Sequence, residues 1–207
     1  VYERFTDRAR EVVILADLAC RELGQSHVGT EHLLVGLVQE VGTAHHVLRA
    51  MGVTVERVRD AITVLFGPAA GPPPEGKLEY APEANLALET ALREALGLRH
   101  DHVGTEHLLL GLLRNNESRG VQVLRRLRVD PDTVRERVLD LLATPGFVSP
   151  ELRPRAGLDH VVSTGSGPVP SRGVVDGVDI RKLAEEVSRL RAEVQELRST
   201  LERLEQR

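Results

Sequence analysis

Aromatic residues are scarce in this 207-residue chain, which has no Trp and only Tyr2, Phe5, Phe66, Tyr80 and Phe147. A core that must be built almost wholly from Leu, Val and Ala favours helices over sheets. Cysteine is scarcer still, because Cys20 stands alone. A single cysteine excludes an internal disulfide and suits a reducing compartment, and its apolar neighbours predict a buried thiol rather than a nucleophile.

Several functional classes are also disfavoured by what is missing. The net charge is −4, and nucleic-acid binders usually carry a basic face. No apolar run approaches the roughly 18 residues that a membrane span needs, and no signal-peptide pattern opens the chain. The sequence has no GxxxxGK[ST] phosphate loop and no spacing typical of a catalytic triad. We therefore expect a cytoplasmic, non-enzymatic protein that binds neither nucleic acid nor membrane.

Eight histidines are present, but no Cys pair or HExxH pattern accompanies them. Four of the histidines recur between two similar segments, where hydrogen bonding within helix turns is the simpler interpretation. We expect no metal site and no cofactor.

The most informative feature that is present is an internal repeat. Residues 27–37 read HVGTEHLLVGL and residues 102–112 read HVGTEHLLLGL, so that ten of eleven positions are identical at an offset of 75. Beyond the motif the offset becomes 76, where Leu48 corresponds to Leu124 and Val53 to Val129. Such self-similarity predicts one supersecondary unit built twice, and two units that bury their apolar faces against each other in one pseudo-symmetric domain.

Helical periodicity and breakers predict four helices in each repeat. Repeat one covers 1–66, with helices from Thr6 or Asp7 to about 23, from Thr30, and over about 43–51 and 54–65. Repeat two covers 79–143, with helices over 82–96, 105–113, 119–127 and 131–142. The fold class is therefore all-α, with a pseudo-two-fold domain over 1–145. Residues 146–178, which are rich in Gly, Pro and Ser, predict a flexible linker.

The segment 179–207 has a heptad pattern. Its a positions are Ile180, Val187, Val194 and Leu201, and all its d positions are Leu. β-Branched residues at a with Leu at d favour a parallel two-stranded coiled coil, which predicts a homodimer. The alternative is a lone amphipathic helix that folds back on the domain.

The repeated Gly-Thr-Glu-His motif has a structural and a functional interpretation. Structurally it is a helix start, in which Gly29 permits the turn, the Thr30 hydroxyl caps amides and Glu31 complements the helix dipole. Functionally, the amides and Thr30 could hold an anion while Glu31 accepts a guanidinium. An arginine-derived group that carries a phosphate has both charges. If Glu31 and its repeat equivalent Glu106 proved sealed from solvent, the motifs would be scaffolding only.

The sequence resembles a known family through FTDRAREVVILADLA (5–19) and the doubled GTEHLL (29–34 and 104–109). Over residues 2–143 it is similar to the Clp N-terminal repeat domain of ClpC-type unfoldases. The resemblance implies an eight-helix domain that receives substrates and adaptors for a proteolytic machine of the stress response. It also implies recognition of phosphoarginine-marked proteins, with Glu31 and Glu106 holding the guanidinium and Thr30 and Thr105 beside them.

Three further residues precede the first motif. Thr6, Arg8 and Arg10 are matched in repeat two by Ala81, Glu83 and Asn85. If these positions help to hold a phosphate, a lost hydroxyl and an added carboxylate weaken the second pocket. We therefore assign Thr6, Arg8 and Arg10 to the site of Glu31 and expect that site to bind better.

In this family, cyclic peptide antibiotics dock near positions that match Tyr2 and Tyr80. Ordinary packing is the alternative role for these tyrosines.

Because it has no phosphate loop, the chain resembles stand-alone ClpC-like proteins that compete for ligands of the full unfoldase. The alternative is that the chain is the front end of a larger ATPase.

The leading functional hypothesis is a non-catalytic binding module of the Clp protease system. It would take phosphoarginine-marked proteins or other ClpC N-domain ligands, as a decoy for or an accessory to the ClpC unfoldase or its adaptors. The alternative is a coiled-coil-mediated structural adaptor that does not read phosphoarginine.

Overall fold

The first repeat folds into four helices that follow the sequence pattern closely. A computed structural model describes residues 4–67, 76, 78–147 and 149–150. In repeat one the elements are α1 (Asp7–Glu22), β1 (His27–Val28), α2 (Thr30–Gln39), α3 (Thr43–Ala50) and α4 (Val55–Phe66). The Thr6 hydroxyl caps α1 by accepting from the Ala9 N–H, as the sequence predicts.

The second repeat has the same plan. Its elements are β2 (Glu79–Tyr80), α5 (Pro82–Gly97), α6 (Thr105–Leu113), α7 (Arg119–Arg126) and α8 (Pro131–Ala143). Pro82 and Pro131 each occupy the first helical turn, where a missing N–H is tolerated. The predicted helix boundaries agree with these bounds to within a residue or two, and the all-α, two-repeat fold class is confirmed.

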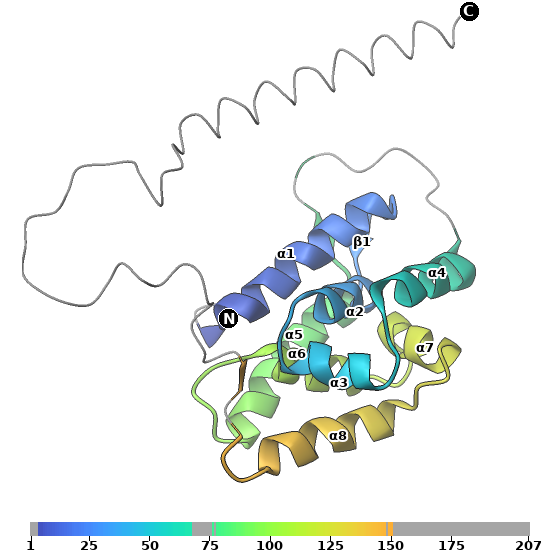
Figure 1. The fold of residues 1–207 in the computed structure, drawn as a ribbon. Helices are drawn as coiled ribbons and strands as arrows, with labels where there is room; N and C mark the ends of the chain where they lie inside the picture. Colours follow the sequence, from blue (N-terminus) through green and yellow to red (C-terminus); the bar gives the residue numbers. More distant parts are fainter. Residues whose placement is uncertain (1–3, 68–75, 77, 148, 151–207) are drawn as a thin grey trace, which may run out of the picture. The chain divides into compact units, whose positions relative to one another are not determined.

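The two motif helices form the centre of the domain. Every residue of α6 is buried, as is α2 from Thr30 to Val38. In Figure 1, α2 and α6 lie between α1 at the top and α8 at the bottom. The core around them is aliphatic, and Phe5 is the only aromatic residue among its fully buried members in the described part of the chain. The composition-based expectation of an aliphatic helical core is therefore confirmed.

The outer helices approach the central ones closely at glycines. A Cβ at Gly36 of α2 would lie 2.5 Å from the Val12 carbonyl oxygen of α1. The equivalent Gly111 of α6 would place a Cβ 2.4 Å from the Ala87 carbonyl oxygen of α5. Each repeat therefore packs its first two helices at a crossing that leaves no space for a side chain at this position.

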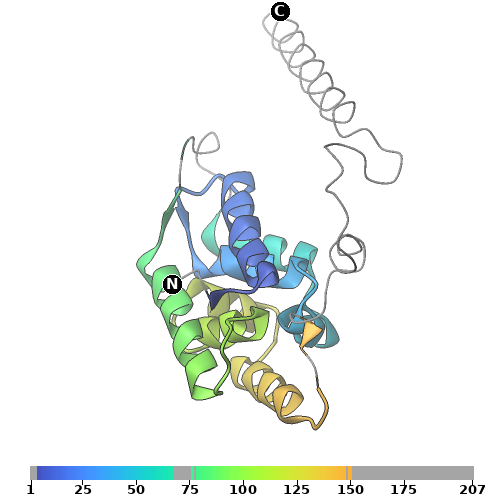
Figure 2. The same ribbon diagram turned by 90° about the vertical axis from the view of Figure 1, so that its left-hand side faces the viewer.

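Short β pairings connect the repeats, which the sequence did not indicate. Strands β1 and β2 pair in parallel with Val28 opposite Tyr80, and they lie side by side in Figure 2. An isolated parallel bridge joins Phe5 to Val103 in the same manner. The chain entering α5 is thereby attached to the first motif, and the chain entering α1 to the second. The two repeats interlock rather than pack as independent units.

Some predictions concern residues outside the described ranges. The coiled coil over 179–207, almost all of the linker over 146–178, and Tyr2 belong to this group. Within the described ranges, no helix is long and apolar enough to cross a membrane.

Candidate functional site

The motif histidine accepts a hydrogen bond from the N-cap glycine at the start of each central helix. Gly29 is the N-cap of α2, and its backbone N–H donates to Nδ1 of His32 at 2.9 Å. Gly104 and His107 repeat this bond at 2.9 Å at the start of α6. A histidine at N3 therefore takes the place that Glu or Gln fills in an ordinary capping box. Burial lowers the pKa of His32 to about 4 and that of His107 to about 3, so that both rings are neutral.

The motif threonines cap helices of the opposite repeat. The Thr30 hydroxyl accepts from the Gly120 N–H at the start of α7, at 2.9 Å. In the mirrored contact, the Thr105 hydroxyl accepts from the Ala44 N–H at the start of α3, at 3.2 Å. The sequence interpretation, in which each threonine caps amides of its own helix, is therefore corrected. Each threonine joins the N-termini of two helices from different repeats.

The motif glutamates point inward, against the N-cap glycines. Glu31 is 1% exposed and Glu106 is 0% exposed. A Cβ at Gly29 would lie 2.3 Å from Oε2 of Glu31, and one at Gly104 would lie 2.6 Å from Oε1 of Glu106. The glycine of the motif is therefore needed for space, because the glutamate folds back over it. The expectation of carboxylates open to solvent at the helix mouth is not met, and the burial is the arrangement that we expect of motifs that act as scaffolding.

Glu31 binds a guanidinium that belongs to the same chain. Nη1 of Arg119, the first residue of α7, lies 3.2 Å from Oε1 of Glu31. Oε2 of Glu31 has no hydrogen-bond partner among the described residues. Burial raises the pKa of the Glu31 carboxyl, while its own backbone N–H and Arg119 lower it and the Glu83 charge raises it further. A desolvated carboxylate with one resident cation is the central feature of the first site.

The structure groups the flanking residues differently from the sequence interpretation. The Thr6 N–H donates to the Val103 carbonyl at 3.0 Å, which places the start of α1 beside the second motif. The Ala81 N–H donates to the Val28 carbonyl at 2.9 Å, which places the start of α5 beside the first motif. The assignment of Thr6, Arg8 and Arg10 to the site of Glu31 is therefore wrong, because the repeats exchange their N-terminal segments.

Each site consequently combines three helix N-termini. The first site joins α2, α5 and α7 around Glu31, with Ala81, Glu83 and Asn85 at the start of α5. The second site joins α6, α1 and α3 around Glu106, and the start of α1 contributes Thr6, Arg8 and Arg10. We define these as site one and site two. The start of α1, with Thr6, Arg8 and Arg10, thus lies at site two and not at the site of Glu31.

The flanking cations of site two have partners of their own. Nη1 of Arg8 contacts Oε1 of Glu40 at 3.1 Å. Nη1 of Arg10 contacts Oδ1 of Asp7 at 2.7 Å on the exposed side of α1. Contacts of exposed ion pairs such as the second are weak and exchange readily with other anions.

Tyr80 and Cys20 have structural contacts. The Tyr80 ring packs partly buried against the core, and its hydroxyl donates to the Val13 carbonyl at 3.4 Å. Cys20 is buried as predicted, and burial raises the pKa of its thiol to about 11. Its Sγ lies 3.1 Å from the Gln25 carbonyl oxygen. The thiol is therefore protonated and unreactive.

One group of side chains at site two has the composition of a metal site. Potential ligand atoms of His100, His102 and Glu106 lie within 4.8 Å of one another. His107 accepts a backbone N–H at Nδ1, so its Nε2 donates to Nδ1 of His100 at 2.9 Å, which leaves the other nitrogen of His100 protonated. Nδ1 of His102 donates to Asp101 at 2.9 Å. In this hydrogen-bond arrangement Nε2 of His102 offers a lone pair, whereas His100 does not.

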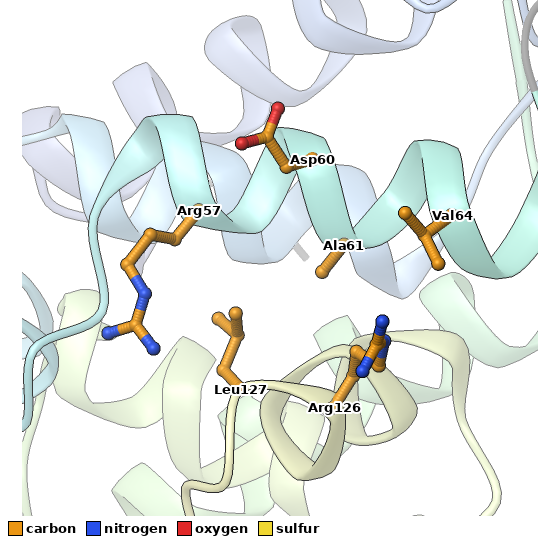
Figure 3. Close-up of a pocket in the computed structure, with 6 residues that line it drawn as sticks. All are labelled: Arg57, Asp60, Ala61, Val64, Arg126 and Leu127. Atoms are coloured by element: carbon orange, nitrogen blue, oxygen red, sulfur yellow. The ribbon is translucent and has the colours of Figure 1, made fainter.

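Two grooves between the repeats were not suggested by the sequence. The first, of about 280 Å³, lies between α4 and α7. Figure 3 shows its six lining residues, which are Arg57, Asp60, Ala61, Val64, Arg126 and Leu127. The second, of about 440 Å³, lies between α3 and α8 and includes Ala50 and Arg137. In the repeat, Ala50 corresponds to Arg126 and Arg137 corresponds to Ala61. The two grooves are therefore equivalent, but the arginine is on α7 in the first and on α8 in the second. Such a relation is visible only once α4 is known to face α7.

Two interlocked four-helix repeats, each with a buried Gly-Thr-Glu-His turn at the start of its second helix, define a double-repeat all-α domain. The chain belongs to the Clp repeat (R) N-terminal domain family, which matches residues 4–82 and 79–167. It is 40% identical over 150 residues to an ATP-dependent Clp protease ATP-binding subunit ClpA homolog of Guillardia theta, covering 72% of this chain and 18% of the relative. It is 39% identical over 145 residues to the negative regulator of genetic competence ClpC/MecB of Bacillus subtilis, covering 70% of this chain and 18% of the relative.

The fold agrees with these sequence matches. The N-terminal domain of the Clp protease associated chaperone ClpD from Arabidopsis thaliana superimposes with a TM-score of 0.59 at 23% identity, covering 70% of this chain and 97% of that domain. The chain spans about a fifth of the length of the curated relatives that it matches. The family resemblance inferred from the doubled motif is confirmed.

Proposed function

We propose that the domain is a non-catalytic binding module of the Clp protease system that recognises phosphoarginine-marked proteins. It would act as a decoy for a ClpC-type unfoldase or as an accessory to it or to its adaptors. The proposal rests on membership of the Clp N-terminal family and on the chemistry of the two sites. Each site sets a carboxylate among the N-termini of three helices. A carboxylate suits a guanidinium, and helix N-termini suit a phosphate.

The observation that carries the proposal is the contact between Glu31 and Arg119. The motif carboxylate accepts a guanidinium from a different helix of a different repeat, at 3.2 Å. Glu106 holds the same position in the second motif and is equally buried. A motif glutamate that receives a guanidinium within the chain supports the same role toward an incoming phosphoarginine.

Site two is the better match to the complete ligand. The start of α1, which carries Thr6, Arg8 and Arg10, is attached beside the second motif by the bond from the Thr6 N–H to the Val103 carbonyl. Positive charge and helix N-termini at one edge would hold the phosphate, and Glu106 would hold the guanidinium. Because Glu106 is 0% exposed, its side chain must turn outward when the ligand enters. Arg10 must also exchange its contact with Asp7 for one with the phosphate.

Calorimetric titration of the full chain with phosphoarginine and with an arginine-phosphorylated peptide tests the proposal. We expect binding to the wild-type chain, and loss of at least tenfold in affinity for Glu106→Gln, which keeps the shape but removes the charge. Unphosphorylated arginine is the ligand control, and Glu89→Gln on the exposed face of α5 is the matched variant. Absence of binding, or equal binding by Glu106→Gln, would refute the proposal.

Burial of both glutamates favours a second candidate function. In it the motifs serve as scaffolding, and the chain is a structural adaptor that bridges partners without reading phosphoarginine. Light scattering on chains with and without residues 179–207 measures whether that segment associates. Pull-downs from lysate with the wild type and the Glu31/Glu106 double variant then separate the candidates, since a scaffold retains its partners in both.

Binding of cyclic peptide antibiotics near Tyr2 and Tyr80 remains a prediction. The contact of the Tyr80 hydroxyl with Val13 gives that ring a packing role, which is compatible with an exposed edge for a ligand. Titration of the Tyr80→Ala variant with such a peptide measures its share in binding.

A further inference from the structure

The two sites differ at the first residue of the helix that the motif threonine caps. In site one that residue is Arg119 of α7, and in site two it is Thr43 of α3. These residues are equivalent in the repeat, at the offset of 76 that relates the later helices. A positive charge at a helix N-terminus opposes the helix dipole. Arg119 therefore needs a compensating partner, and Glu31 is that partner.

Arg119 is held by two residues of the other repeat. Its guanidinium contacts Glu31 at 3.2 Å, and its central carbon lies 4.7 Å from the centre of the Phe66 ring. The residue equivalent to Phe66 in repeat two is Leu142, which offers no such ring face. The carboxylate on one side and the ring on the other form a clamp for a planar cation. This clamp is specific to site one.

The surroundings of site one disfavour an anion. Glu83 at the start of α5 adds a negative charge that acts on Glu31, and Ala81 replaces the threonine found at the start of α1. A cavity of about 60 Å³ beside Thr30 and Glu83 leaves space for a few water molecules. Because Arg119 already contacts Glu31, a guanidinium that enters site one must first displace it.

We infer that Arg119 is the resident occupant of site one, so that the domain takes one external phosphoarginine per chain, at site two. Arg119 is thereby a specificity-determining residue: at one of two equivalent sites it takes the place of an external guanidinium and connects the two repeats. The identity of the external ligand rests on the proposed function, whereas the occupancy of site one by a guanidinium does not. The two parts are tested separately.

The first experiment is the stoichiometry of phosphoarginine binding to the full chain by calorimetry. We expect one ligand per chain, abolished in Glu106→Gln and retained within about twofold in Glu31→Gln. Two ligands per chain, or loss of binding in Glu31→Gln alone, would overturn the inference. If the wild type binds no phosphoarginine, the proposed function fails and the second experiment decides the occupancy of site one.

The second experiment is chemical rescue of an empty site one. Arg119→Thr introduces the residue that repeat one carries at the same place, and methylguanidinium is supplied in solution against methylammonium as the charge-matched control. We expect a lower melting temperature for the variant and a rise of about 4 °C at ten times the Kd of methylguanidinium. The wild type, the double variant Arg119→Thr/Glu31→Gln and the exposed-arginine variant Arg93→Ala should show no such rise.

Rescue distinguishes occupancy from a general effect of charge. Equal stabilisation by methylammonium, or a rise that persists in the double variant, would overturn the inference. If Arg119→Thr does not fold alone, folding is measured in the presence of each cation. Recovery with methylguanidinium only supports the inference, and failure with both contradicts it.

Discussion

Replacement of Thr30 by Val tests whether the two repeats are joined through the motif threonines. Thr30 is 1% exposed, and its hydroxyl accepts the Gly120 N–H at 2.9 Å. The other cap of α7, the Ser118 hydroxyl, serves the Val121 N–H instead. Valine keeps the shape and the methyl group of threonine but removes the acceptor. The Gly120 N–H is then left buried with no partner in the described part of the chain.

The magnitude follows from that one orphaned donor. An unpaired buried N–H costs about 1–3 kcal/mol, and loss of a helix N-cap typically costs about 1 kcal/mol. Because both figures describe the same bond, they are not added, and we expect about 2 kcal/mol of lost stability. In a domain of about 150 residues this lowers the melting temperature by about 4–8 °C.

Thermal unfolding and amide hydrogen exchange together check the prediction. The Gly120 amide should exchange about 30-fold faster in Thr30→Val, since about 2 kcal/mol of local protection is lost. Thr30→Ser, which keeps the hydroxyl, is the matched control and should protect Gly120 nearly as well as threonine. If the two variants are equally stable, or if exchange rises in the first turn of α2 rather than α7, the cross-repeat cap does not hold the repeats together.

Two other predictions concern pH and helix crossing. His32 has a folded-state pKa near 4, below its ordinary 6.5, so it contributes stability that is present above pH 6.5 and lost as the pH falls toward 4. Urea unfolding at pH 7, 5 and 4 should show that this group costs the domain roughly 3 kcal/mol of stability as the pH falls. Protonation of Glu31, whose pKa is raised, opposes part of this loss. The loss should be smaller in His32→Gln, and a pH dependence of stability that is the same in both chains would refute the prediction. Gly36→Ala should destabilise the domain by about 2 kcal/mol in thermal unfolding, since its Cβ meets the Val12 carbonyl. Gly97→Ala, whose Cβ meets no described atom within 4 Å, should instead stabilise it by about 0.5–1 kcal/mol, and equal effects would contradict the packing argument.

Local chemistry accounts for what could be predicted of the fold. Helix positions follow from apolar periodicity and from breakers such as Gly67, and the bounds of α6 and the starts of α5 and α8 were predicted to the residue. Repetition also predicted the shared helix start and the hydrogen bonds of His32 and His107 within it. These features depend on residues that are only a few positions apart in the chain, so they can be predicted from the sequence pattern.

The candidate site was only half predictable. Glu31 and Glu106 were identified by the motif, but the residues around each were assigned to the wrong partner. One signal for Arg119 was available, because an arginine at a helix N-terminus opposes the dipole and needs an acidic partner. Nothing in the spacing shows which carboxylate that partner is, since 88 residues separate the pair.

The amino-acid sequence by itself determined that this protein builds one four-helix unit twice, with an aliphatic core and a glutamate at the start of each central helix. Tertiary structure alone decided that the chain entering the first helix of each repeat meets the motif of the other, that both glutamates are buried, and that Arg119 lies against one of them. The physical reason is that periodicity specifies which face of a helix is buried. It does not specify which helix covers that face when two nearly identical repeats offer the same surface.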